Sequence, residues 1–274
     1  MKKYFFCFLL SLLIGIIPVM AAHVQPIQTY SKCMNKKIPA VIITPDGYSA
    51  QKNYPVLYLL HGYSDNQNKW IKTVPEIKEY ADIYNFIIVC PDGNFSSWYM
   101  DSPIDSSFRY ETYTSKELPN WIDNHYSTIA SRKGRAITGL SMGGHGALYL
   151  AFRHQDISGA AGSMSGGLDL RPFPKKWDIS KRLGSYSEHP ENWERNSVIN
   201  LVHLLTSGSL QITFDCGIND QFYKVNCNLH KKLLERNIPH DFTIRPGAHN
   251  WEYWKNSIAF QAVFFNHFFE QNKN

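Results

Sequence analysis

The chain has 274 residues, of which 43% are hydrophobic, 14% are aromatic and 19% are charged. That length is enough for one sizeable α/β domain, and the hydrophobic fraction is ordinary for a globular protein. The formal charge of +5 includes Lys2 and Lys3 at the extreme N-terminus, and so weak a bias predicts no nucleic-acid-binding surface.

Residues 1–22 are predicted to form a signal peptide. Lys2 and Lys3 precede an apolar run over residues 4–20, and the small residues Ala21 and Ala22 follow it. The run is short for a membrane-spanning helix and contains Pro18. We therefore expect cleavage and export, to the periplasm or the medium, and no stable membrane insertion afterwards. An uncleaved anchor is the alternative.

Cleavage would leave four cysteines, which are too few for a disulfide scaffold in a chain of this length. Cys90 and Cys216 each end an apolar run and are expected to be buried thiols. A disulfide between Cys216 and Cys227 stays open as an alternative. The chain has neither a CxxC nor an HExxH pattern, so no metal site is expected.

Short apolar runs alternate with amphipathic stretches along the rest of the chain, which is typical of an α/β sheet. Neither repeats nor linker-like segments interrupt residues 23–274, so we predict a single domain. Strands are expected at residues 27–34, 38–43, 56–60, 86–90, 135–138, 159–163, 211–214 and 241–244. Helices are expected at 76–84, 110–126, 142–152 and 223–235 and at the C-terminus, and Pro119 predicts a kink in the second of them.

Residues 166–200 do not fit this alternation. They contain Pro172, Pro174 and Pro190 and have no clean period. We interpret them as an insertion near the functional site, either a lid or a wall of the substrate pocket.

Gly139, Ser141 and Gly143 form a G-x-S-x-G pattern between a predicted strand and a predicted helix. This context is typical of a nucleophile elbow, a sharp turn that strains the serine backbone and needs glycines on either side. The serine would lie at a helix N-terminus, where negative charge is favoured. We predict that Ser141 is a nucleophile; the alternative is a glycine-rich helix start with an idle serine.

An elbow serine needs an acid and then a base, in that order along the chain. Asp220 lies in the loop beyond Gly217, whereas Asp215 is expected within the strand and in a structural hydrogen bond. His249 follows the strand at 241–244, but His240 precedes it and would lie at the wrong end of the sheet. Asp220 and His249 are therefore the predicted acid and base.

An acyl-transfer reaction also needs two N–H donors for the oxyanion. The backbone of Met142, directly after Ser141, is the first expected donor. The second is the backbone of Tyr63, just past the strand at 56–60, with His61 expected to support that loop.

Trp98 and Asp101 follow the strand at 86–90 and are tentative substrate contacts. Trp98 could stack on a sugar or an aromatic acyl group, or it could be a loop anchor.

Five segments together resemble the esterase D-type putative esterases: LLHGYSD at 59–65, SWYMDSP at 97–103, GLSMGGHGAL at 139–148, DCGIND at 215–220 and GAHNWEYW at 247–254. That family includes feruloyl and acetyl esterases, S-formylglutathione hydrolases and mycolyltransferases. The resemblance implies an α/β-hydrolase fold with a mostly parallel sheet. It also implies Ser141, Asp220 and His249 as the triad and Tyr63 and Met142 as the oxyanion hole.

The predicted activity is therefore that of an exported serine esterase, with feruloyl or acetyl esters of plant polysaccharide as the expected substrates and without a cofactor. A siderophore esterase, a general short-chain acyl esterase, an S-formylglutathione hydrolase and an acyltransferase are alternatives that use the same chemistry. The S-formylglutathione hydrolases are cytosolic, which the signal peptide disfavours. A non-catalytic binding protein on the same scaffold is the alternative of a different class.

Overall fold

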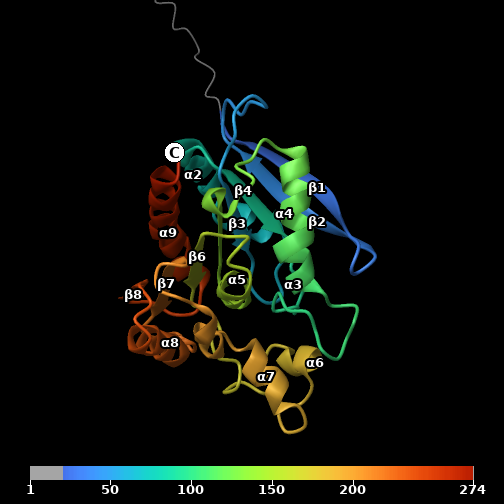
Figure 1. Ribbon diagram of the computed structural model, residues 1–274, viewed down its shortest axis with the longest axis vertical. Helices are drawn as coiled ribbons and strands as arrows, with labels where there is room; N and C mark the ends of the chain where they lie inside the picture. Colours follow the sequence, from blue (N-terminus) through green and yellow to red (C-terminus); the bar gives the residue numbers. More distant parts are fainter. Residues whose placement is uncertain (1–20, 274) are drawn as a thin grey trace, which may run out of the picture.

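The computed structural model describes residues 21–273, which fold around one eight-stranded β-sheet (Figure 1). The strands are β1 (His23–Ser31), β2 (Lys36–Thr44), β3 (Val56–Leu60), β4 (Ile87–Pro91), β5 (Arg135–Gly139), β6 (Ala160–Met164), β7 (Gln211–Gly217) and β8 (Asp241–Arg245). Their order across the sheet is β1-β2-β4-β3-β5-β6-β7-β8. The first two pairings, β1–β2 and β2–β4, are antiparallel, and every later one is parallel. This mostly parallel sheet flanked by helices confirms the predicted α/β-hydrolase fold class.

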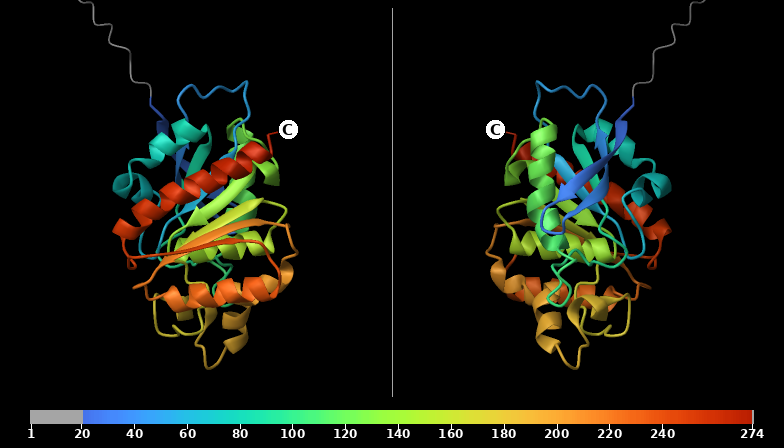
Figure 2. Two further views of the ribbon diagram at one scale, coloured as in Figure 1. Left: turned by 90° about the vertical axis from the view of Figure 1, so that its left-hand side faces the viewer. Right: turned by 90° about the vertical axis from the view of Figure 1, so that its right-hand side faces the viewer.

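Helices cover both faces of the sheet, as a parallel sheet requires. The α-helices are α1 (Lys69–Thr73), α2 (Ile77–Tyr84), α3 (Tyr110–Thr112), α4 (Leu118–His125), α5 (Met142–Arg153), α6 (Ile179–Leu183), α7 (Pro190–Asn196), α8 (Tyr223–Glu235) and α9 (Trp251–Gln271). Short 3₁₀ turns lie at η2 (Arg132–Gly134), η3 (Val198–Asn200) and η4 (Val202–Leu204). In the two side views of Figure 2, α9 crosses one face of the sheet and α4 the other.

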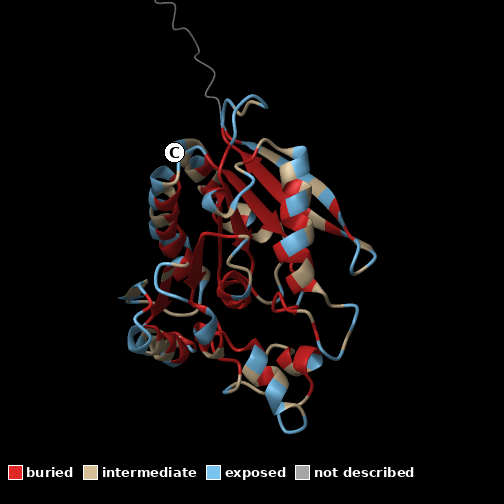
Figure 3. Ribbon diagram, viewed as in Figure 1, coloured by how far each residue is buried: buried red, intermediate tan, exposed pale blue. Residues whose placement is uncertain are grey.

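Alternate residues of the central strands enter two separate hydrophobic cores, one on each face of the sheet. In β3, Val56, Tyr58 and Leu60 pack in the core that α4, α5 and α8 complete, whereas Leu57 and Leu59 pack in the core of α1, α2 and α9. Side chains of a strand point to opposite faces in turn, so burial on both sides explains why these strands read as continuous apolar runs. Figure 3 shows the resulting buried centre of the sheet.

The predicted strands and helices agree with the structure to within a few residues at their ends. The largest difference among the strands is β1, which begins at His23 and pairs with β2 along its whole length, from His23–Thr44 to Ser31–Lys36. Its solvent-exposed polar residues hide this pairing from a search for apolar runs.

The expected helix over 110–126 is interrupted rather than simply kinked. A π-helical segment, η1 (Tyr113–Glu117), joins α3 to α4, and Pro119 follows it in the first turn of α4. Proline lacks an N–H and clashes with the carbonyl four residues earlier, so the wider π turn before it relieves both problems.

Residues 166–200 form an ordered insertion of short helices, α6, α7 and η3. Leu168, Leu170 and Trp193 are buried in the core beneath it. The indole N–H of Trp193 donates to the carbonyl of Gly184 over 3.1 Å, which ties α7 to α6.

All but the last two residues of the predicted signal peptide, 1–22, lie outside the described residues. Within residues 21–273, the search for a helix long and apolar enough to cross a membrane finds none. Cys33, Cys90, Cys216 and Cys227 are free thiols, so the alternative of a Cys216–Cys227 disulfide is not realised. Cys90 and Cys216 are buried, as expected.

Candidate active site

Ser141 lies in the tight turn between β5 and α5, with backbone angles φ 55° and ψ −116°. Such angles are strained for a residue with a side chain and are typical of a nucleophile elbow. Two glycines make the turn sterically feasible. A Cβ at Gly139 would lie 2.7 Å from the backbone of Gly143, and one at Gly143 would lie 2.6 Å from the carbonyl oxygens of Leu60 and His61.

A continuous chain of hydrogen bonds joins the three side chains that the sequence predicts as a triad. The Nε2 of His249 lies 2.9 Å from the Oγ of Ser141, and its Nδ1 lies 2.8 Å from the Oδ2 of Asp220. The side chain of Asp220 is fully buried, and its other oxygen accepts a 2.7 Å bond from the backbone N–H of Phe222. This geometry holds the imidazole with one nitrogen toward a carboxylate and the other toward the serine hydroxyl.

The loops that carry Asp220 and His249 are bonded to each other. The N–H of Ile218 donates to the carbonyl of Arg245, and the N–H of Asn219 donates to the carbonyl of Gly247, over 3.0 and 2.9 Å. Gly247 has φ 144°, which disfavours other residues. Parallel strands β7 and β8 thus deliver the acid and the base to the same edge of the sheet.

Asp215, the alternative acid, has a different environment. It lies inside β7, and both of its carboxylate oxygens accept bonds from the hydroxyl of Ser257 at 2.6 Å. The side-chain amide of Gln261 donates a third bond over 2.9 Å. Asp215 therefore holds α9 against the sheet, which is the structural role expected for it.

The two expected oxyanion donors flank Ser141 and have spare hydrogen-bonding capacity. Among the described residues, the backbone N–H groups of Tyr63 and Met142 donate to no protein acceptor. Met142 is the first residue of α5, where N–H groups have no partner within the helix.

His61 fastens the Tyr63 loop to its neighbour, the loop after β4. Its Nδ1 donates to the carbonyl of Gly62 over 2.8 Å, and its Nε2 accepts a 2.7 Å bond from the N–H of Gly93. The hydroxyl of buried Tyr99 accepts from the N–H of His61 over 3.1 Å. The support role expected for His61 matches these contacts.

A small, largely aromatic pocket of about 280 Å³ opens over Ser141 and His249. Trp177, Trp251 and Trp254 line it. The ring of Trp254 stands edge-on to His249, with centroids 4.8 Å apart. Tryptophan rings beside polar groups such as Asp65, Ser141 and His249 are typical of a site for small organic ligands.

The comparisons with known proteins agree with this geometry. Residues 31–264 match the family of putative esterases. The chain belongs to that family. Its resemblance to the esterase D-type group is thereby confirmed, since acetyl esterases and ferulic acid esterases are among its relatives.

Three relatives show how far the similarity extends. The chain is 26% identical over 258 residues to an acetyl esterase of Caldicellulosiruptor saccharolyticus, covering 86% of this chain and 95% of that one. It is 36% identical over 134 residues to an esterase of Mycobacterium tuberculosis, which is 47% of this chain but only 29% of the mycobacterial protein. A solved ferulic acid esterase superposes with a TM-score of 0.79 at 28% identity, covering 91% of this chain and 99% of the other.

Trp98 does not line the pocket of this esterase-family chain. Its side chain is only 1% exposed, and its indole N–H donates to the carbonyl of Trp177 over 3.1 Å. It also packs edge-on against the ring of His145. These contacts match the loop-anchor alternative, in which buried Trp98 holds Trp177 in place. Because Trp98 does not reach the pocket, it cannot stack directly on a substrate there.

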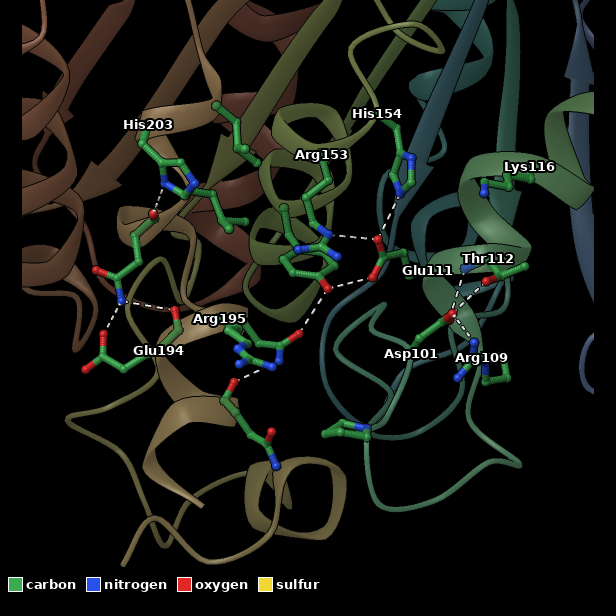
Figure 4. Close-up of a pocket in the computed structure, with 17 residues that line it drawn as sticks. Asp101, Arg109, Glu111, Thr112, Lys116, Arg153, His154, Glu194, Arg195 and His203 are labelled. Atoms are coloured by element: carbon green, nitrogen blue, oxygen red, sulfur yellow. Dashed lines mark hydrogen bonds and ion pairs between the residues drawn. The ribbon is translucent and has the colours of Figure 1, made fainter.

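Asp101 also lies away from the pocket. Its carboxylate accepts bonds from the N–H and hydroxyl of Thr112 and pairs with Arg109 over 3.2 Å. It lines a different cavity (Figure 4), so the expectation of a substrate contact at the Ser141 site is not supported for this residue either.

Trp177 and Asp65 line the pocket without having been predicted. Trp177 comes from the insertion at 166–200, and it and Asp178 have positive φ angles of 49° and 54°. The hydroxyl of Tyr63 lies 3.4 Å from the carboxylate of Asp178, which joins the insertion to the oxyanion loop. Burial raises the pKa of Asp65, and Lys69, 3.6 Å away, opposes the shift.

Of Asp65 and Trp177, only Asp65 lies in a sequence motif that could have pointed to the site. Asp65 ends the LLHGYSD segment, whereas Trp177 stands in a stretch without any periodicity. The aperiodic stretch predicted a wall of the pocket but not which residue would form it.

Proposed function

We propose that this chain is a serine carboxylic ester hydrolase that forms an acyl-enzyme on Ser141. The observation that carries this is the hydrogen-bonded series from Ser141 through His249 to buried Asp220, with bonds of 2.9 and 2.8 Å. Membership of the putative esterase family supports it independently.

The chemistry follows from the positions of these groups. His249 takes the hydroxyl proton as Ser141 Oγ attacks the acyl carbon, and the N–H groups of Tyr63 and Met142 bind the oxyanion. The tetrahedral intermediate collapses, the C–O bond to the alcohol breaks, and His249 gives its proton to the leaving alcohol. Water then repeats the cycle on the acyl-enzyme, releasing the acid and free Ser141. Asp220 keeps Nδ1 protonated and stabilises the imidazolium.

We propose acylated carbohydrate, carrying feruloyl or acetyl esters, as the substrate and a location outside the cytoplasm. Three observations support this: the signal-peptide pattern of residues 1–22, the tryptophan-lined pocket, and similarity to proteins named as an acetyl esterase and a ferulic acid esterase. We expect an aromatic acid or a sugar ring to pack against the aromatic surface of Trp177 and Trp251.

The test compares the mature protein with its Ser141→Ala variant on p-nitrophenyl acetate, methyl ferulate and acetylated xylan. Ser187→Ala, a change at an exposed serine of the insertion, is the matched control. We expect kcat/KM of the Ser141 variant to fall by about 10⁴-fold or more, and that of the control to stay unchanged. A fluorophosphonate probe should label the wild type and the control but not the Ser141 variant.

Each alternative has its own outcome. Equal and negligible activity of wild type and Ser141→Ala on all three esters, without probe labelling, would overturn the hydrolase and favour a binding protein. Labelling with slow hydrolysis that accelerates when an alcohol acceptor is added would favour an acyltransferase. A preference for S-formylglutathione or for a siderophore trilactone over all three esters would replace the carbohydrate substrate.

A further inference from the structure

The sheet has an open edge at β8. This strand is the last in the sheet order, and among residues 21–273 it pairs with β7 alone. In the left view of Figure 2 it runs between α9 and α8. A groove of about 490 Å³ follows the strand, with Arg245 and Phe260 among the residues that line it. The groove shares no lining residue with the pocket over Ser141.

The backbone of β8 turns two residues toward this open edge. The carbonyl of Arg245 accepts a bond from the N–H of Ile218, on the β7 side. Backbone groups of successive strand residues point to opposite sides, so Thr243 also faces β7, whereas Phe242 and Ile244 face outward. Within residues 21–273, neither outward N–H donates to a loop, a helix or a side chain. Free N–H and C=O groups along an edge are a template for another strand.

The sequence of β8, DFTIR, is complementary to itself in the antiparallel direction. When two copies pair about Thr243, Asp241 of one copy lies opposite Arg245 of the other, at both ends of the pair. Phe242 lies opposite Ile244, and since both face outward, they exchange N–H···O=C bonds in both directions. Any other antiparallel register separates the opposite charges. Opposite charges and apolar side chains directly across from each other stabilise paired strands.

Both charges are poorly paired within a single chain. Asp241 is exposed and forms no ion pair with any of the residues 21–273. Arg245 approaches Asp215 only to 3.5 Å, and that carboxylate is already bonded to α9. The guanidinium of Arg245 lies 4.3 Å from the ring centre of Phe260, beside the groove. A carboxylate from a second copy would therefore supply a partner at each end of the strand.

The edge also leaves apolar surface in water. Ile244 is 44% exposed, although it lies within the sheet, and Phe260 of α9 is 58% exposed. The strand at the opposite edge of the sheet, β1, contains Pro26, which removes one donor, whereas β8 contains no proline. Natural edge strands are commonly protected by such a proline. β8 lacks this protection, and its exposed side chains favour a partner that covers them.

We propose that β8 is the interface of a homodimer, in which two copies pair antiparallel about a twofold axis at Thr243 and form one continuous sheet. A twofold axis makes each contact occur twice, so it needs a surface that is complementary to itself. An unrelated peptide would fit this edge only if it carried the same order of charges, which a second copy carries in every case. The proposal does not depend on ester hydrolysis, because the groove and the pocket over Ser141 have separate residues.

The test is sedimentation velocity of the full mature chain at about 1 to 100 µM, where we expect a concentration-dependent dimer. Asp241→Lys places a second cation opposite Arg245 at both ends of the pair, and it should raise the Kd of the dimer by about tenfold or more. Asp156→Lys is the matched control, with the same charge change at an exposed position outside the groove. It should leave the Kd unchanged. Both variants should keep the wild-type activity on p-nitrophenyl acetate.

Two further measurements distinguish this interface from another one. Ile244→Pro removes an outward N–H but no bond to β7, so the variant should fold with β8 in place and sediment as a monomer. In the wild type, the amides of Phe242 and Ile244 should exchange with solvent more slowly as the protein concentration rises. A wild type that stays monomeric throughout the range overturns the proposal. So does a dimer that survives both Asp241→Lys and Ile244→Pro, or equal weakening by Asp241→Lys and Asp156→Lys.

Discussion

The two ends of α5 differ in which structural elements carry the residues that surround them. At its N-terminus, Ser141 and its partners stand on loops directly after β3, β5, β7 and β8, around an aromatic pocket of about 280 Å³. At its C-terminus, paired charges from scattered segments surround a cavity of about 720 Å³. A reaction needs atoms held to within a fraction of an ångström, so its residues are tied to strand ends and tight turns that leave a pattern in the sequence. A charge-lined cavity needs only side chains of suitable charge around a space of suitable shape, so it leaves no recognisable pattern in the sequence.

The largest expected effect is on kcat, and it distinguishes Asp220, in the loop after β7, from Asp215 within β7. Asp220→Asn should lower kcat by about 10⁴-fold, because an amide cannot hold the tautomer of His249 that leaves Nε2 free for Ser141. Steady-state kinetics on p-nitrophenyl acetate measures it. Asp215→Asn is the matched control, and its kcat should fall by less than about tenfold, since Asp215 contacts α9 rather than His249. A larger loss for Asp215→Asn than for Asp220→Asn would instead make Asp215 the catalytic acid.

At the other end of α5, the expected effect is on stability instead of activity. Glu111→Gln should lower the free energy of unfolding by about 3 kcal/mol at pH 7, because it leaves Arg153 and His154 without their buried carboxylate. The pKa of Glu111 is about 2 in the folded chain, against an ordinary value of 4.5, because burial opposes ionisation but hydrogen bonds from His154, Tyr149 and Arg153 outweigh it. Its stabilisation is thus complete above pH 4.5 and lost as the pH falls toward 2. Urea titrations at pH 7 and pH 3 measure both values.

The difference in the free energy of unfolding between the variant and the wild type should therefore shrink at low pH. Wild type and Glu111→Gln should differ by about 3 kcal/mol at pH 7 and by clearly less at pH 3. Esterase activity at pH 7, well below the denaturation midpoint, should be unchanged. A large drop in kcat without a change in stability would mean that the two ends of α5 are coupled and do not act independently.

The smallest effect concerns the insertion wall. Trp177→Ala should raise the KM for methyl ferulate by about tenfold and that for methyl acetate much less, because an aromatic contact contributes about 1 kcal/mol beyond its buried area. Trp121→Ala, on α4 and outside the pocket, is the control. Equal changes in both KM values would show that Trp177 shapes the loop and does not contact the acyl group.

Much of the fold was predictable because the central strands are buried on both faces. Residues 56–60 and 86–90 are short apolar runs with turn residues around them, and β3 and β4 follow these limits to within one residue. Two elements were missed in part: the N-terminal half of β1, whose exposed residues carry no apolar signal, and the π-helical segment η1. The π turn depends on how the chain packs around Pro119, which local periodicity does not report.

The candidate site divides in the same way. Ser141, Asp220 and His249 were predictable because an elbow and two loops after parallel strands constrain both residue type and chain order. Trp98 and Asp101 also follow a strand, but their side chains turn into the interior and toward Arg109, away from the pocket. Position after a strand predicts where a backbone lies and not where a side chain points.

The sequence by itself determined the fold class, the segments that form most of the strands and the three residues that line up as a triad, because each of these follows from local constraints of turn geometry and strand burial. Only the tertiary structure decided that Trp177 from the insertion covers Ser141, that Trp98 holds it in place, and that Glu111 pairs with Arg153 and His154 beside one cavity. These contacts join residues far apart along the chain, and their formation depends on side-chain packing between elements, which leaves no periodic trace in the sequence.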